Sequence, residues 1–273
     1  MTNVRLTTAS GVSFITKGTD YFISKSIELY GEWSFGEIDL LKKIIKSGDN
    51  IIEVGSNIGA HTVFLALDIC QHGKIFSFEP RRILFQILCG NLSINNIENV
   101  YTYCFGLGEK VETFREKKLE FNDVLNAGGI PLGIRPGDEE IIEIKKLDDV
   151  IDPTEKISLI KADIEGYELK FLKGATNVIN INRPYLYLEN EDASKSRALI
   201  QYLWDINYEI WWHIVPLFNP KNRAKTRQNI FEGICSFNIV CSPCEKKTNF
   251  INLEKVDDEN FHPLKSKQKH GKK

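Results

Sequence analysis

The segment IIEVGSNIGA, residues 51–60, decides the expected fold, because a short β-rich run ends in a turn that contains two glycines. We predict a buried strand over 51–55 and a helix over 59–70, apolar on nearly all sides, that packs on a sheet. Glycines at such a turn allow close approach of a ligand, and the helix amino terminus offers free N–H groups to an anion. The segment therefore predicts a ligand site at the end of a parallel strand.

Further β-rich runs alternate with helical patterns along the chain. The predicted strands cover residues 74–79, 100–105, 157–163, 185–189, 208–214 and 234–241, and helical spacing of apolar residues covers 35–46 and 83–92. This alternation predicts an α/β fold of Rossmann-like type, with a seven-stranded, mostly parallel sheet and helices on both faces.

The chain is expected to divide into three parts. Residues 1–34 are predicted to form a small β-rich N-terminal extension, residues 35–245 the main domain, and residues 246–273 a basic, disordered tail. A long connection over 106–156 is rich in glycine, at Gly128, Gly129, Gly133 and Gly137, and is expected to arch over a site.

Composition limits the class of protein. Of 273 residues, 42% are hydrophobic and 26% charged, which suits one substantial core. The formal charge is −2, and because residues 265–273 hold five lysines, the rest of the chain carries 30 − 37 = −7, which disfavours a nucleic-acid groove. No apolar run approaches the roughly 20 residues of a membrane span, and the stretch MTNVRLTTASG at residues 1–11 has no apolar segment behind its charges, so a cytoplasmic protein is expected.

The six cysteines are scattered through apolar contexts rather than arranged in a disulfide framework, so reduced thiols are expected. Cys241 and Cys244 form a lone CxxC without a second pair or ligating histidines. No metal site is therefore predicted.

Details of the glycine turn discriminate among ligands. Asn57 stands where a dinucleotide-binding turn needs its second glycine, and the Gly-Lys-Ser/Thr of a phosphate loop is absent. Glu53, at the strand end, suits a ligand with an ammonium group. Glu79 follows Gly59 by 20 residues and ends the next strand, where an acid accepts hydrogen bonds from both ribose hydroxyls. A ribose and an amino-acid zwitterion together describe S-adenosylmethionine, with an NAD-binding fold as the alternative.

These residues resemble the FkbM-type family of S-adenosylmethionine-dependent methyltransferases. The matching segments are YGEW (30–33), EVGSNIGAHT (53–62), FEP (78–80), KADIEGYE (161–168), LEN (188–190), PLFN (216–219) and SFN (236–238). The resemblance implies the class I methyltransferase fold, with strand order 3-2-1-4-5-7-6 and the last strand antiparallel. It also implies O-methylation of hydroxyls on sugars, glycolipids, glycans or natural products.

The acids of the segment KADIEGYE, residues 161–168, are the candidates for catalytic roles. Ligands of open parallel sheets bind beyond the carboxyl ends of strands where the strand order reverses, which places Asp163 beside the turn at Gly55 to Gly59. Methyl transfer from a sulfonium is an in-line displacement that needs no metal in principle, and a hydroxyl acceptor must lose its proton. Asp163 is the predicted base or aligning group. Glu165 either shares this site or caps the following helix, while Glu168 and Lys173 are expected to be solvated.

The full candidate site combines this reasoning with the resemblance. Its cofactor-binding residues are Tyr30, Glu32, Glu53, Gly55, Ser56, Asn57, Gly59, His61, Thr62, Glu79 and Pro80, its catalytic candidates Asp163, Glu165, Glu189 and His213, and its substrate-binding candidates Asn219, Lys221, Arg223 and Asn238. Four cations between Lys221 and Arg227 suggest an anionic acceptor, with an ordinary solvated loop as the alternative.

The predicted function is therefore an S-adenosylmethionine-dependent O-methyltransferase that acts on a hydroxyl of a sugar, glycan or related small molecule. A non-catalytic S-adenosylmethionine-binding module and, less favoured, an NAD-dependent oxidoreductase are the alternatives. Neither nucleic acid nor a membrane is an expected partner.

Overall fold

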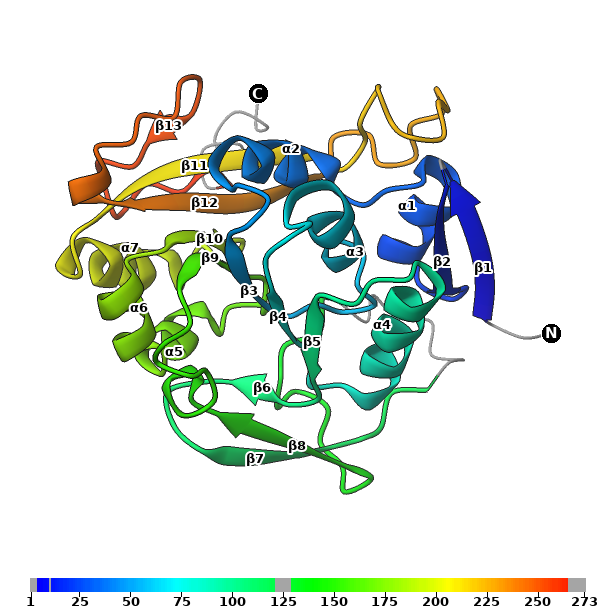
Figure 1. Cartoon of the computed structure of the whole chain (residues 1–273), viewed down its shortest axis with the longest axis horizontal. Coiled ribbons are helices and arrows are strands. Elements are labelled where there is room, and N and C mark those ends of the chain that lie inside the picture. The colour runs from blue at the N-terminus through cyan, green and yellow to red at the C-terminus, as the bar shows by residue number, and fades with distance from the viewer. Residues whose placement is uncertain (1–3, 10, 121–128, 265–273) are drawn as a thin grey trace, which may run out of the picture.

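The computed structural model describes residues 4–9, 11–120 and 129–264, and a large sheet forms its centre (Figure 1). The strands of this sheet are β3 (Asn50–Val54), β4 (Ile75–Phe78), β5 (Val100–Tyr103), β9 (Ile157–Ala162), β10 (Tyr185–Glu189), β11 (Tyr208–Pro216), β12 (Cys235–Pro243) and β13 (Glu254–Lys255). Their order is β13-β11-β12-β10-β9-β3-β4-β5.

The sheet confirms the expected topology. Without β13, the order of the strands is 3-2-1-4-5-7-6 when they are counted along the chain. The pairs β3–β4, β3–β9, β4–β5 and β9–β10 are parallel, whereas β12 is antiparallel to both β10 and β11. The additional strand β13 pairs antiparallel with β11 at the edge and was not expected from the sequence.

Helices cover both faces of the sheet, as expected for parallel strands. One face carries α2 (Phe35–Ile44), α3 (Thr62–Phe64), the π-helical turn η1 (Leu65–Ile69) and α4 (Arg82–Ile94), and the other α5 (Glu168–Lys173), α6 (Thr176–Asn182) and α7 (Ser196–Asp205) (Figure 1). A hydrophobic core lies on each face of the sheet. Neighbouring residues of β3 point to opposite faces, so Ile51 packs into one core and Ile52 into the other. No helix in the described ranges has the length and apolar character that crossing a membrane requires.

The N-terminal extension contains a hairpin and a helix. Strands β1 (Val4–Ala9) and β2 (Val12–Lys17) pair antiparallel apart from the main sheet, as expected, but α1 (Ile23–Tyr30) was not predicted. Asn91 of α4 links this hairpin to the glycine turn. Its side chain bonds both the N–H and the carbonyl of Ile15 in β2, at 2.6 and 3.1 Å, and the carbonyl of Ile58 at 2.7 Å.

The glycine-rich connection over 106–156 contains a second, three-stranded sheet of order β6-β8-β7. Its strands are β6 (Gly106–Leu107), β7 (Glu112–Glu116) and β8 (Glu140–Lys145), followed by the 3-10 turn η2 (Leu147–Asp149). The expected arch is thus partly regular structure, and Gly128 lies outside the described residues.

The C-terminal segment differs from the expectation of disorder beginning at residue 246. After the 3-10 turn η3 (Cys244–Lys246), Phe250 and Val256 are buried, and the ring of Phe250 lies 5.0 Å from that of Trp211 in β11. His262 is also buried and its Nε2 donates to the carbonyl of Asn190 at 2.8 Å. These few apolar and aromatic contacts order residues 246–264, while the five terminal lysines lie outside the described residues.

All six cysteines lie in the described part of the chain and are free thiols, as expected. Cys241 is buried and Cys244 is exposed, so the two members of the CxxC occupy different environments.

Replacing Asn91 with alanine should lower the free energy of unfolding by about 2–4 kcal/mol, because one buried and two partly buried backbone groups lose their partner. Urea unfolding of purified protein measures this loss. Ser93, exposed on the same helix, provides the matched control, and Ser93→Ala should leave stability unchanged. Equal stability of the two variants would show that Asn91 does not hold the hairpin to the turn.

Candidate active site

A cavity of about 330 Å³ lies at the carboxyl ends of the central strands, a volume typical of small-molecule sites. Its lining comes from the turn after β3, the loop after β4, strand β6 and the ends of β9 and β10. The strand order reverses at β3, which pairs with β4 on one side and β9 on the other. The cavity therefore occupies the switch point that the sequence predicts.

The glycine turn has the left-handed backbone that its residues suggest. Gly55 has φ 84°, Asn57 φ 51° and Gly59 φ 82°. A Cβ on Gly55 would lie 2.0 Å from the carbonyl oxygen of Asp163, so a larger residue would separate the turn from the end of β9. The N–H groups of Gly55 and Ser56 both donate to the carbonyl of Phe78, at 2.9 and 3.0 Å.

Glu53, the next-to-last residue of β3, lines the cavity with only 1% of its surface exposed. Its carboxylate accepts a hydrogen bond of 2.5 Å from the Thr62 hydroxyl. Burial raises the pKa of Glu53 to about 7. Thr62 does not line the cavity, and it orients Glu53 from behind.

Glu79 is fixed at the end of the second strand. Its two carboxyl oxygens accept hydrogen bonds from the backbone N–H groups of Asn57 and Arg81, at 2.9 and 2.8 Å. Burial raises its pKa, and the side chain lines the cavity beside Pro80. The predicted ribose-binding acid is therefore held in place by the loops on both sides of it.

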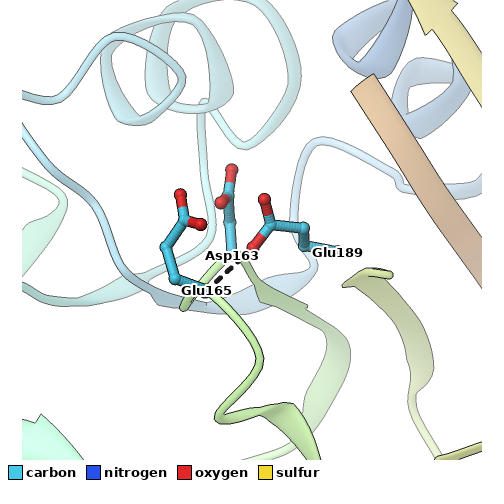
Figure 2. A group of neighbouring side chains, drawn as sticks. All are labelled: Asp163, Glu165 and Glu189. Atoms are coloured by element: carbon cyan, nitrogen blue, oxygen red, sulfur yellow. Dashed lines mark hydrogen bonds between the residues drawn. The ribbon is translucent and has the colours of Figure 1, made fainter. Parts of the chain in front are cut away.

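Three acids converge on the opposite side of the turn. The carboxylates of Asp163, Glu165 and Glu189 offer oxygen atoms that lie within 4.8 Å of one another, and Figure 2 shows them pointing toward the same side. The N–H of Glu165, a residue with φ 56°, donates to Glu189 Oε2 at 2.9 Å. We call these three side chains the carboxylate cluster.

Burial raises the pKa of Glu165 to about 8, and the neighbouring charges of Asp163 and Glu191 act in the same direction. Burial, followed by the same kind of repulsion from Asp163, raises the pKa of Glu189 well above its ordinary value. Converging carboxylates attract cations of any kind, and among the described residues no histidine or cysteine joins them. The absence of a metal at this site stays a prediction.

A buried lysine that the sequence analysis did not assign lies behind the cluster. Lys161 in β9 is 1% exposed, and its Nζ donates to Asp163 Oδ2 at 3.4 Å. Burial would lower its pKa, but the charges of Asp163, Glu37 and Glu53 outweigh burial and raise it. The available signal was a lysine inside a mostly apolar strand, because buried lysines need anionic partners.

Glu37 of α2 is a second site residue that the sequence analysis missed. It lines the cavity at 2% exposure, and its Oε1 accepts hydrogen bonds from the hydroxyls of Ser34 and Ser236, at 2.8 and 3.1 Å. Its Oε2 lies 3.9 Å from Lys161 Nζ. Glu37 precedes Leu41 by four residues and therefore shares the apolar, core-facing side of the helix. An acid on that side was the available signal of a buried carboxylate.

Glu168 corrects the expectation of a solvated side chain. It is 4% exposed, and its Oε1 accepts hydrogen bonds from the N–H groups of Ile164 and Gly166, at 3.1 and 3.2 Å. Glu168 rather than Glu165 thus binds backbone N–H groups at this junction, in the turn before α5, and the Glu165 carboxylate lines the cavity. Lys173 is exposed, as expected.

Several predicted site residues lie outside the cavity lining, namely Tyr30, Glu32, Gly59, Thr62, His213, Asn219, Lys221 and Arg223. Glu32 instead accepts hydrogen bonds from Asn219 Nδ2 at 2.8 Å and from the N–H of Arg223 at 3.1 Å. The Tyr30 hydroxyl accepts one from the N–H of Ile230 at 2.9 Å. These contacts hold the loop after β11 against α1. Asn238 does line the cavity.

The basic loop does not present its cations to the cavity. The guanidinium of Arg223 pairs with Asp68 and lies over the rings of Phe35 and Phe64, at 4.8 and 4.3 Å. Lys221 and Arg227 are exposed, and neither belongs to the lining. The loop was expected over the substrate, and the structure instead packs Arg223 against Phe35 of α2, Phe64 of α3 and Asp68 of η1.

The two histidines of the predicted site, His61 and His213, lie in different parts of the structure. His61 lines the cavity, its Nε2 donates to the carbonyl of Trp33 at 3.1 Å, and burial lowers its pKa to about 3, so the ring is neutral. His213 contacts the Tyr187 hydroxyl through Nδ1 at 2.8 Å, away from the lining. Burial also lowers the pKa of His213. His213 is therefore not brought together with the carboxylate cluster.

The strand order, the antiparallel last strand and the cavity at the switch point define a class I methyltransferase fold. Residues 53–210, more than half of the chain, match the methyltransferase FkbM domain. The chain belongs to the FkbM methyltransferase family.

Curated relatives are similar over part of the chain. Methyltransferase sdnD of Sordaria araneosa is 26% identical over 164 residues, 48% of this chain and 61% of that protein. Hexuronic acid methyltransferase AglP of Haloferax volcanii is 29% identical over 153 residues, 53% of this chain and 58% of that protein. The chain spans about three fifths of the length of these relatives. A solved methyltransferase FkbM from Methylobacillus flagellatus KT is 20% identical with a TM-score of 0.47, over 72% of this chain and 44% of that one.

The raised pKa values predict a pH dependence of stability. An acid whose pKa is raised by folding binds its proton more tightly in the folded state, so the proton stabilises the fold. This contribution to stability is lost as the pH rises from the ordinary pKa of 4.5 to the pKa in the folded state. For Glu53 and Glu165 the folded values are about 7 and about 8. The thermal midpoint of the ligand-free protein should therefore fall between pH 5.5 and 8.5, as differential scanning fluorimetry can measure.

Glu165→Gln should flatten this pH dependence, because a neutral amide replaces the group that titrates. Glu254→Gln, at an exposed acid of β13, is the control and should keep the wild-type profile. If the thermal midpoints of wild type and Glu165→Gln changed with pH in the same way, the titration could not be assigned to Glu165.

Proposed function

We propose that the chain is an S-adenosylmethionine-dependent O-methyltransferase that acts on a hydroxyl of a sugar, a glycan or a related small molecule. The observation that carries the proposal is the direct contact between the glycine turn at Gly55 and the end of β9 at Asp163. This contact places a candidate base at the edge of a cavity whose other walls suit the methyl donor.

The described residues fit the donor in three places. Glu79 is positioned to accept hydrogen bonds from ribose hydroxyls, and Glu53 is a buried acid suited to an ammonium group. The backbone of Gly55 to Asn57 allows close approach of the ligand. The excess of acids along the lining also favours a ligand that carries a sulfonium cation.

The donor supplies an electrophilic methyl group, and the chain's own residues must align the acceptor and remove its proton. Asp163 suits both tasks because one of its oxygens is held by Lys161 while its side chain is 33% exposed toward the cavity. Glu165 and Glu189 lie close enough to share the hydrogen bonds of an acceptor hydroxyl.

The acceptor proposal rests on the cavity and on a relative. Phe22, Trp33, Leu217 and Ile234 line the cavity with apolar and aromatic surface, against which the apolar face of a sugar ring can pack. The similarity to a hexuronic acid methyltransferase supports a carbohydrate acceptor. An anionic acceptor is not part of the proposal, because Arg223 pairs with Asp68 and the lining is rich in acids.

Isothermal titration should show binding of S-adenosylhomocysteine and no binding of NAD. Glu79→Gln should weaken S-adenosylhomocysteine by roughly 10–100-fold, because a charged hydrogen-bond acceptor for the ribose is lost, a contribution of about 1.5–3 kcal/mol. Glu98→Gln, at an exposed acid before β5, is the control and should bind as wild type. Binding of NAD without a response to S-adenosylhomocysteine would instead favour an oxidoreductase.

Labelled methyl transfer from S-adenosylmethionine to extracted glycans and free sugars tests catalysis itself. Asp163→Asn should lower kcat by about 10²–10⁴-fold, as expected for loss of a general base, while the affinity for S-adenosylhomocysteine, which lacks the sulfonium charge, changes little. Asp257→Asn, at an exposed position, is the control. If the wild type binds the donor but methylates none of these acceptors, the non-catalytic binding module becomes the better interpretation.

A further inference from the structure

The carboxylate cluster concentrates negative charge beyond what its described neighbours neutralise. Oxygen atoms of Asp163, Glu165 and Glu189 lie within 4.8 Å of one another, in a cavity partly closed to water. Like charges at this distance in a buried site are not all ionised together, and a proton or another cation relieves the repulsion. The raised pKa of Glu165, to about 8 because of burial, agrees with this geometry.

The groups that face the cluster come from every element around it. They are Lys161 of β9, Glu53 of β3, His61 before α3, Glu37 of α2, Arg81 after β4, Glu168 of α5, Tyr187 of β10 and Glu191 after β10, and Lys195 lies against Gly166, the residue after Glu165. Each of the three cations is shared with another acid. Lys161 lies 3.9 Å from Glu37, Arg81 3.5 Å from Glu116, and Lys195 3.3 Å from Asp192. The surroundings therefore leave an excess of acids.

A second observation in the same cavity indicates that it receives a cationic ligand. Glu37, whose side chain is 3% exposed, lines the cavity, and its Oε2 has no hydrogen-bond partner among the described residues. A buried carboxylate oxygen without a donor is costly unless a ligand supplies one. The ammonium and sulfonium groups of the proposed donor bring positive charge of the required sign.

We propose that Asp163, Glu165 and Glu189 share a proton in the ligand-free cavity, release it when the sulfonium donor binds, and accept the proton of the acceptor hydroxyl during methyl transfer. This inference rests on the proposed function and extends it, because it makes proton uptake and release part of each catalytic cycle.

The step balances in atoms and charge. The acceptor oxygen forms a bond to the methyl carbon, the sulfur–methyl bond breaks, and its electron pair stays on sulfur as a neutral thioether. The proton of the hydroxyl passes to the cluster. The sulfonium cation becomes a neutral thioether while the cluster gains a proton, so the net charge of the cavity and its ligands stays the same. Binding of the next donor then releases that proton to solvent.

The proposal links proton release to ligand binding, and this linkage can be measured. S-adenosylmethionine should release about one proton more on binding than S-adenosylhomocysteine, because the two ligands share their amino, carboxylate and ribose groups and differ only in the methylsulfonium charge. The preference for the cationic ligand should then rise with pH, by at most about tenfold per unit, while the cluster holds its proton.

Isothermal titration in phosphate and in Tris, buffers with different ionisation enthalpies, counts the protons exchanged for each ligand between pH 6.5 and 8.5. The wild-type protein needs no variant for this comparison. We expect an excess release with S-adenosylmethionine that disappears above the titration range of the cluster. Equal proton exchange with both ligands at every pH would overturn the inference and leave the proposed function intact. Failure of both ligands to bind would instead overturn the proposed function, and the inference with it.

Variants assign the proton to the cluster. Glu165→Gln should remove at least half of the excess proton release, and Glu189→Gln should do the same if the proton is shared. Glu254→Gln, the exposed control, should release as many protons as wild type. Wild-type proton release in both cluster variants would place the titrating group elsewhere and overturn the assignment.

Discussion

The approach of two backbones at the end of β3 and β9 is the constraint on which the site depends. Gly55 lies so close to the carbonyl of Asp163 that a Cβ would be 2.0 Å away. The same turn is tied to the next strand, because its N–H groups bond the carbonyl of Phe78. The glycine turn and Asp163 are consequently held in one unit, an arrangement that suits the catalysis by alignment proposed above.

Charge is the second constraint, because the fold gathers acids where burial opposes ionisation. Lys161, from the middle of the sheet, contacts Asp163, and the backbone N–H groups of Ile164 and Gly166 neutralise part of the charge of Glu168. Burial raises the pKa of Glu165, although the charge of Arg81 opposes this shift, and burial also raises the pKa of Glu189. The site is thus suited to a positively charged ligand and to proton transfer at the same carboxylates.

Much of the fold could be predicted because the parallel strands are short, buried and rich in β-branched residues, as in Ile51–Val54 and Ile157–Ile160. The segments that were missed lack this pattern. Strand β13 has two residues, and residues 246–264 contain few apolar side chains. Phe250 and His262 acquire order from residues distant in sequence, such as Trp211 and Asn190. Lys161 and Glu37 were missed for a similar reason, because a partner makes each of them tolerable inside the protein.

The sequence by itself determined the sheet, the glycine turn with its positive φ angles, and the presence of acids at the ends of β3, β4, β9 and β10, because these depend on local pattern and on the residue types that such turns accept. Only the tertiary structure decided which acids meet. It placed Glu168 against the turn before α5 and Glu165 in the cavity, and it paired Arg223 with Asp68 outside the cavity lining. These outcomes depend on distances between segments far apart in the chain, which no local pattern specifies.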